Sequence, residues 1–277
     1  MNDLPQDTPF YCFDREAFTL KLPDGSRLRI PASGEVSAEA ASGADPARFS
    51  PIIADSLFAA SAIYAGRIPF IANAVLIGSK VLLLSDHSET RRDRLALRFA
   101  GLGYQVSDSM VAVDPVRLNV HLNGMPLVIP HELAEEVQAV SEPLFPQAAC
   151  DRTGLASPAP DRAWPCLGMI AQIRPLPART SASALTKLSD MQAYNMLSNR
   201  IFLRQMAEAL LPSGEFHRTR LHMARTLGLY VFSPSADGGS TAEDAAFAYL
   251  HDEVRAWVTG EDTSPDTAPA DGAGGLS

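Results

Sequence analysis

Cysteine, positive charge and long apolar runs are all scarce in this sequence of 277 residues. Three cysteines, Cys12, Cys150 and Cys166, lie far apart and form no Cys-x-x-Cys pair. Their spacing argues against a disulfide framework and a zinc site and favours a reducing compartment. Lysine and arginine number 23 against 32 acidic residues, so the formal net charge of −9 lacks the electrostatic footprint of a general nucleic-acid binder.

The sequence also shows no membrane-spanning segment and no export signal. The longest apolar stretches, such as 72–77 and 81–84, fall far short of the roughly 18 residues that span a bilayer. Residues 1–9 hold no basic residue and no apolar core, which a signal peptide requires. We therefore expect a cytoplasmic protein that does not cross a membrane. A content of 46% hydrophobic and 20% charged residues is typical of a globular chain with a sizeable core.

Residues 1–50 predict N-terminal strands and a loop. Apolar and polar residues alternate over 18–22 and 27–30, on either side of Pro23-Asp24-Gly25-Ser26. Because Asp-Gly favours positive φ at low steric cost, this pattern predicts a β-hairpin. Residues 31–49 are rich in Ala, Ser, Gly, Glu and Pro, which indicates a loop or a poorly ordered connection.

Residues 51–180 predict an α/β core. Apolar residues in 52–64 recur at steps of three and four, which predicts a helix ended by Gly66. Short apolar runs at 70–77 and 81–84 predict neighbouring strands buried in a sheet. Further short strands are expected over 104–106, 111–113, 118–122, 126–129 and 167–174, with a helix at 131–140 and a loop at 141–164.

A strand–turn–helix unit begins at the second of these runs. After Leu84 the apolar spacing becomes helical, and Gly101 and Gly103 supply a stop signal. The buried side of this helix is expected to carry Leu95, Phe99 and Leu102, and the more exposed side Arg91, Arg94 and Arg98. Asn123-Gly124 is a strong hairpin signal between the strands that flank it.

The remaining sequence predicts a helical region at 181–259. Long helices are expected at 188–211, 216–230 and 242–258, and they could form a cap or an interaction surface. Residues 260–277 offer almost nothing to bury and are expected to be a disordered tail. The predicted class is therefore α/β, with a sheet flanked by helices, an N-terminal β-hairpin and C-terminal helices.

Five segments between residues 65 and 130 follow one another in a distinctive order. They are Val81–Leu84, Asp86–Arg94, Leu95–Leu97, Gly103-Tyr104 and Ser107-Asp108-Ser109. This order resembles the HPr kinase/phosphorylase-like P-loop family. In that family an apolar strand leads into a G-x-x-G-x-G-K-S/T loop, a Leu-Ala-rich helix, a Gly-Tyr turn and an Asp-Asp strand end. The resemblance implies a P-loop-type sheet.

The residues that hold ATP in that family are replaced here. The resemblance places the three glycines at Asp86, Glu89 and Arg91, the lysine at Arg92 and the magnesium-binding hydroxyl at Asp93. The family's Asp-Asp pair becomes Asp108-Ser109, and a histidine often found on the preceding strand becomes Ile71-Ala72. Asp108 alone keeps its chemistry, and the resemblance makes it the candidate catalytic remnant.

The chemistry of the substituted loop also disfavours a nucleotide. Asp86 and Glu89 have the spacing of an N-cap and a third-position carboxylate, and they would occupy the place of a phosphate. Two unit charges about 4 Å apart repel by roughly 4 kcal/mol at an effective dielectric constant near 20. We therefore expect weak ATP binding in the usual pose, and no cofactor or metal.

Two basic groups remain open to two interpretations. The guanidinium groups of Arg91, Arg92, Arg94 and Arg98 suit a phosphate or carboxylate, or they pair with Asp86, Glu89 and Asp93 on a solvated helix face. A second group makes a partner or nucleic-acid contact or forms another solvated face. That group comprises Arg218, Arg220, His222 and Arg225. His87 and His131 are interpreted as surface histidines, and Met191, Met196, Leu203 and Met206 as core residues.

These observations predict a degenerate HPr kinase-like protein that acts as a binding or regulatory module with a protein partner, without nucleic acid or membrane contacts. An alternative is an active ATP-dependent serine kinase/phosphorylase in which Arg92 replaces the lysine and Asp93 or Asp108 binds magnesium. A third possibility is a purely structural protein whose C-terminal helices bind a partner.

Overall fold

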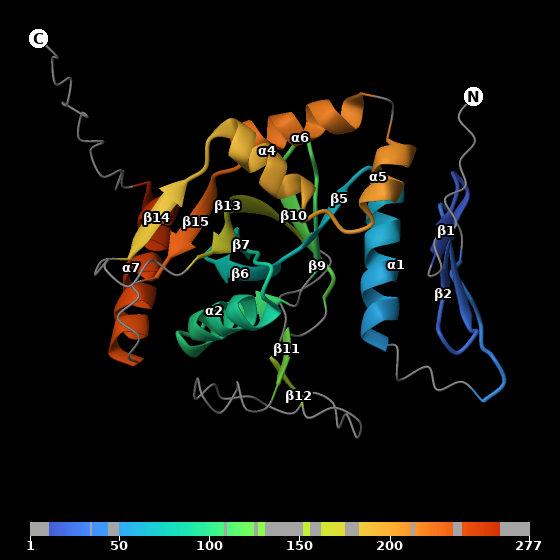
Figure 1. The fold of residues 1–277 in the computed structure, drawn as a ribbon, viewed down its shortest axis with the longest axis horizontal. Coiled ribbons are helices and arrows are strands. Elements are labelled where there is room, and N and C mark those ends of the chain that lie inside the picture. Colours follow the sequence, from blue (N-terminus) through green and yellow to red (C-terminus); the bar gives the residue numbers. More distant parts are fainter. Residues whose placement is uncertain are drawn as a thin grey trace, which may run out of the picture.

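The computed structural model describes residues 11–33, 35–43, 50–107, 110–124, 127–130, 152–155, 162–174, 183–211, 214–234 and 240–260. As predicted, the protein is mixed α/β, with a nine-stranded mixed sheet, flanking helices, a small N-terminal antiparallel sheet and C-terminal helices (Figure 1). The predicted helix at 131–140 lies outside the described residues, as does the tail at 260–277 apart from Gly260. No helix among the described residues is long and apolar enough to cross a membrane.

The large sheet has the strand order β5-β9-β10-β13-β7-β6-β8, and β15 and β14 continue it beside β13. Its strands are β5 (Ile68–Ile71), β6 (Asn73–Ile77), β7 (Lys80–Leu84), β8 (Gln105–Ser107), β9 (Met110–Val113), β10 (Asn119–Leu122), β13 (Ala163–Ile173), β14 (Ala184–Lys187) and β15 (Leu229–Ser233). The central strands β7, β13 and β15 are parallel, so their carboxyl ends lie at the same edge. A separate antiparallel pair is formed by β11 (Leu127–Pro130) and β12 (Arg152–Leu155).

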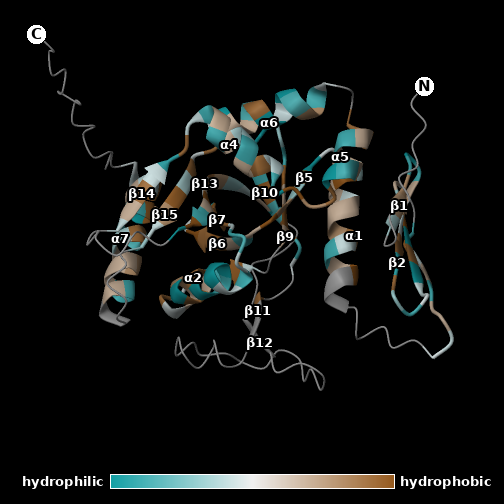
Figure 2. Cartoon of the chain, in the orientation of Figure 1, coloured by the Kyte–Doolittle hydropathy of each residue, from teal (hydrophilic) through white to brown (hydrophobic). Residues whose placement is uncertain are grey.

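Helices cover both faces of this sheet. They are α1 (Ser50–Tyr64), α2 (Glu89–Gly101), α4 (Asp190–Ser198), α5 (Arg204–Leu210), α6 (Glu215–Thr226) and α7 (Ser240–Thr259). On β7, Val81 and Leu83 join the core beneath α1, α4, α5 and α6, whereas Leu82 and Leu84 join the core beneath α2 and α7. Apolar colours therefore follow the central strands in Figure 2, while teal covers much of α2. Because successive side chains of a strand point to opposite faces of the sheet, one apolar run contributes to both cores.

The N-terminal hairpin is confirmed and carries additional strands. β2 (Ala17–Lys21) pairs with β3 (Arg27–Pro31) in antiparallel register, and Gly25 has the positive φ of 90° that the turn requires. β1 (Tyr11–Phe13) adds to β2, and β4 (Ser37–Glu39) adds to β3. The loop predicted at 31–49 therefore contains a strand, because three exposed residues there pair with the open edge of the hairpin.

Two predictions about the core strands are wrong. The run at 70–77 is split at Ala72, which belongs to neither strand: β5 pairs with β9, and β6 pairs with β7 and β8. Asn123-Gly124 does not connect paired strands: β10 pairs with β9 and β13, whereas β11 pairs with β12. Local turn chemistry at Gly124, which has a φ of 74°, does not determine which strand follows as a neighbour.

The C-terminal half differs from the prediction in three places. The helix predicted at 188–211 is two helices, because Leu203 adopts a left-handed φ of 50° and the Phe202 N–H donates to Pro69 in the sheet. The helix predicted at 216–230 ends at Thr226, and β15 follows. The loop predicted at 141–164 contains β12 and the start of β13. The region 181–259 is consequently not only helical, since β14 and β15 extend the sheet of the core.

Candidate functional site

The turn between β7 and α2 is the place where the resemblance puts a phosphate loop. Ser85 is fully buried; its N–H donates to Ile170 in β13 and its hydroxyl donates to the Ile71 carbonyl at 2.8 Å. Ser88 is the N-cap of α2, and its hydroxyl oxygen accepts the Arg91 N–H at 3.3 Å. Ser88 thus replaces Asp86, which the spacing had indicated as the cap.

Asp86 is held by side-chain contacts instead. Its carboxylate accepts the His87 N–H at 2.7 Å and the Arg91 Nε–H at 2.6 Å, and its side chain is completely buried. Arg91 remains 44% exposed at the side chain. Glu89, predicted at the third helical position, is the first residue of α2, and its side chain is 65% exposed. The buried acid of this turn is therefore Asp86 alone, and Arg91 neutralises it.

Arg92 and Asp93 form a second pair, inside the molecule. Both residues are 3% exposed, and Arg92 Nε lies 3.3 Å from Asp93 Oδ1. Asn73, fully buried on β6, donates to the same Asp93 oxygen at 2.9 Å. Burial raises the pKa of Asp93, and this dominates the opposing effects of Arg92 and Asn73. The pair ties α2 to the start of β6.

A third arginine approaches from the opposite helical layer. Arg200, which follows α4, is 4% exposed, and its Nη2 donates to the Ala171 carbonyl in β13 at 3.3 Å. Desolvation lowers the pKa of Arg200; the nearby Asp86 carboxylate opposes this shift, and Arg92 adds to it. Three arginines thus converge on two buried carboxylates at the carboxyl end of β7.

Asp55 on α1 is the fourth acidic group around this turn. Asn123 Nδ2 lies 3.5 Å from its Oδ1. Burial raises the pKa of Asp55 from 3.8 to about 6, and Glu89 contributes in the same direction, while the hydrogen bond from Asn123 and the charge of Arg92 lower it. The sequence offered no motif for Asp55, because Asp55 comes near Arg92 and Glu89 only in the tertiary structure.

The structure gathers four of the five predicted loop residues, Asp86, Arg91, Arg92 and Asp93, into paired positions, and leaves Glu89 at the surface. The candidate catalytic residue Asp108 lies outside the described residues. The burial of Arg92 was missed, although helical spacing puts it on the same side as Leu95, Ala96 and Phe99, all of which are buried. His87 is exposed, as expected, and His131 lies outside the described residues.

Magnesium and a triphosphate do not fit these side chains. A phosphate loop presents backbone N–H groups from a glycine-rich turn, a free ammonium and a hydroxyl. Here the residues in the lysine and hydroxyl positions, Arg92 and Asp93, are bound to each other, and Asp86 already accepts a backbone N–H of the turn. Among the described residues, no group of three or more acidic, histidine or cysteine side chains could hold a metal ion.

The second basic group is divided between the surface and the interior. Arg218, His222 and Arg225 are exposed on α6, but Arg220 is only 2% exposed. Its guanidinium lies 4.6 Å from the ring centres of both Tyr194 and Phe216. Arg220 therefore belongs to the packing between α4 and α6. The predicted core methionines are similarly divided: Met206 is fully buried and Met191 is 67% exposed.

No protein-family model and no curated protein matches this sequence. The resemblance to HPr kinase-like proteins consequently rests on the order of the sequence segments alone.

Replacing Asp55 with asparagine is expected to stabilise the protein above pH 6. Because the folded-state pKa of about 6 exceeds the ordinary value of 3.8, folding favours the protonated acid, and stability falls as pH rises between these values. About two pH units at 1.36 kcal/mol each set an upper bound, so we expect a gain of roughly 1–2 kcal/mol. The gain should disappear below pH 3.8. Urea unfolding across this pH range measures it.

Asp114→Asn is the matched control. Hydrogen bonds from the Arg117 and Val116 N–H groups lower the pKa of Asp114, so its ionised form stabilises the fold at neutral pH. That substitution should cost stability at neutral pH, and the loss should shrink as the solution is acidified. A gain from Asp55→Asn that is the same at every pH would contradict the role of burial at Asp55.

Proposed function

We propose that this protein is a degenerate HPr kinase-like protein that serves as a binding or regulatory module in a protein complex. The observation that carries this proposal is the replacement of the phosphate loop by two ion pairs, Arg91 with Asp86 and Arg92 with Asp93. A triphosphate in the usual pose would have to break both pairs and leave buried carboxylates beside its own charges. Such a rearrangement opposes binding strongly, because an unpaired buried charge is costly.

The fold supports the proposal that this protein keeps the family's scaffold and has lost its nucleotide site. The strand, turn and helix stand in the order that the family uses, and the carboxyl ends of parallel strands border the turn. Arg92 keeps a positive charge at the lysine position, but its partner is the chain's own Asp93 and not an open groove. We propose that a protein partner uses this scaffold in the cytoplasm.

Isothermal titration of the whole protein with Mg-ATP, Mg-ADP and pyrophosphate tests the proposal. We expect no measurable heat of binding for any of the three. Micromolar affinity for one of them would overturn the proposal. Repeating the titration with Arg92→Met shows whether any weak binding uses the lysine-equivalent position, since binding at that position should then be lost.

The active-kinase alternative makes a separate prediction about Asp108. If the protein transfers phosphate to a serine-bearing partner, Asp108→Asn should abolish transfer of label from ATP, whereas transfer that survives this change points to a contaminating kinase. The purely structural alternative predicts that variants of the turn after β7 leave partner affinity unchanged. A regulatory role for the turn predicts that Arg91→Lys alters that affinity.

A further inference from the structure

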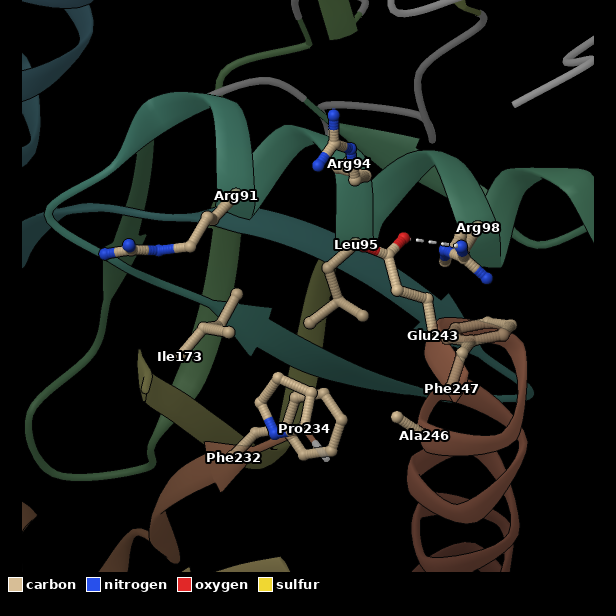
Figure 3. A pocket seen from close by; sticks show the side chains of 10 residues that line it. All are labelled: Arg91, Arg94, Leu95, Arg98, Ile173, Phe232, Pro234, Glu243, Ala246 and Phe247. Carbon is tan, nitrogen blue, oxygen red and sulfur yellow. Dashed lines mark hydrogen bonds and ion pairs between the residues drawn. The ribbon is translucent and has the colours of Figure 1, made fainter. Parts of the chain in front are cut away.

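A cavity of about 270 Å³ lies between α2 and α7. Its floor is apolar and includes Leu95, Ile173, Phe232 and Phe247, and it opens at the carboxyl ends of β13 and β15. In Figure 3, Leu95 projects from α2 toward Phe232 and Pro234, while Arg91 and Arg98 lie at opposite ends of the cavity. Crevices at the carboxyl ends of parallel strands are common ligand sites.

The two ends of the cavity differ in their free hydrogen-bonding capacity. Arg98 donates to Asp244 at 2.6 Å and to Glu243 at 3.3 Å, so carboxylates of α7 occupy it. Arg91 donates only to Asp86, through Nε and Nη2, and its remaining N–H groups make no hydrogen bond within the described part of the chain. A guanidinium has five N–H donors, and Arg91 is 44% exposed. Its free edge can therefore receive a carboxylate.

We propose that this cavity binds a small amphipathic carboxylate, with its acid group on Arg91 and its hydrocarbon part along Leu95 and Phe232 toward Phe247. The volume of about 270 Å³ corresponds to roughly nine water molecules at about 30 Å³ each, which matches an acid of about six to eight carbons. Arg91 offsets the charge of Asp86, and Arg94 also lines the cavity, so the end that receives the ligand carries no net negative charge. This inference goes beyond the proposed function and does not depend on nucleotide binding.

Hexanoate and its neutral analogue hexanamide test the proposal on the unmodified protein. Binding is followed by titration of the methyl resonances of Leu95 and Ile173. We expect saturable shifts with hexanoate and at least roughly tenfold weaker binding of hexanamide, because the amide loses the charge-assisted hydrogen bonds to Arg91. Equal binding of the two compounds, or no shift with hexanoate up to its solubility limit, would overturn the proposal.

A cavity-filling variant locates the site. Ala246 is 2% exposed and lines the cavity, so Ala246→Leu should fill part of it and abolish the hexanoate-dependent shifts. Ala248→Leu, on the exposed side of α7, is the matched control and should leave binding unchanged. Hexanoate binding that persists in a folded Ala246→Leu protein, as judged by its circular dichroism, would place the ligand elsewhere and overturn the proposal.

Discussion

Arg92→Met is expected to lower the free energy of unfolding by about 3–5 kcal/mol at neutral pH, because it leaves the buried Asp93 carboxylate without its nearest counter-charge. Methionine keeps an unbranched chain in place of the arginine stem, and the hydrogen bond from Asn73 to Asp93 remains. The effect therefore reports the charge and not a cavity. Guanidinium denaturation at neutral pH, with the slope of the transition compared between variants, measures this loss.

Removing the other partner should cost less. Burial already raises the pKa of Asp93, so folding gains little from its charge, and Asp93→Asn keeps the side-chain volume and an oxygen for the Asn73 donor. Glu89→Gln is the surface control: Glu89 lies 4.0 Å from Arg92 with a side chain 65% exposed, and its loss should cost under about 1 kcal/mol. A larger loss from Asp93→Asn than from Arg92→Met would contradict this account of the buried pair.

Arg220→Lys is the second substitution with a large expected effect, a loss of about 2–4 kcal/mol. Arg220 is stacked against the rings of Tyr194 and Phe216, and it donates to the hydroxyls of Ser198 and Tyr194. A lysine keeps the buried charge but loses the planar stacking and the forked donors, and charged hydrogen bonds contribute about 1.5–3 kcal/mol each. Thermal and denaturant unfolding should both show the loss.

A hydrophobic replacement separates charge from shape at this position. Arg220→Met removes the charge that burial disfavours and keeps an unbranched chain, so we expect it to cost less than the formally conservative Arg220→Lys. Arg218→Lys, on the exposed side of α6, should change stability by under about 0.5 kcal/mol. If lysine is tolerated better than methionine at position 220, burial does not disfavour the charge there as proposed.

Periodicity predicted the elements whose environment is uniform along their length. The hairpin around Gly25 and the helix at 52–64 each bury one consistent side, whereas the strand that became β7 is buried on both faces and reads as a continuous apolar run. The elements that were missed depend on distant partners. The break at Leu203 follows from the hydrogen bond of Phe202 to Pro69, and no local signal indicates it.

The sequence predicted most of the residues that form the candidate site, but only part of their arrangement. The sequence shows a run of charged side chains after Leu84, and pairing of the arginines with Asp86 and Asp93 was one interpretation of it. The choice of cap was wrong, because Ser88 competes with Asp86 and the carboxylate prefers a guanidinium. No pattern in the sequence indicates that Asp55 and Arg200 belong to the site. Asp55 on α1 and Arg200 after α4 reach the turn from other layers of the fold.

Two strands, β10 and β15, share one edge of β13, and this arrangement has a consequence for the synthesis of the protein. β10 pairs with residues 163–165, and β15 pairs with residues 169–173 on the same side of the strand, while β7 takes the opposite side. Because the chain emerges from the ribosome in order, the later half of β13 keeps an unsatisfied edge until residues 229–233 have been made. An open edge of this kind attracts strands of other nascent chains. We therefore expect the chain to be most prone to aggregation before residues 229–233 have been made.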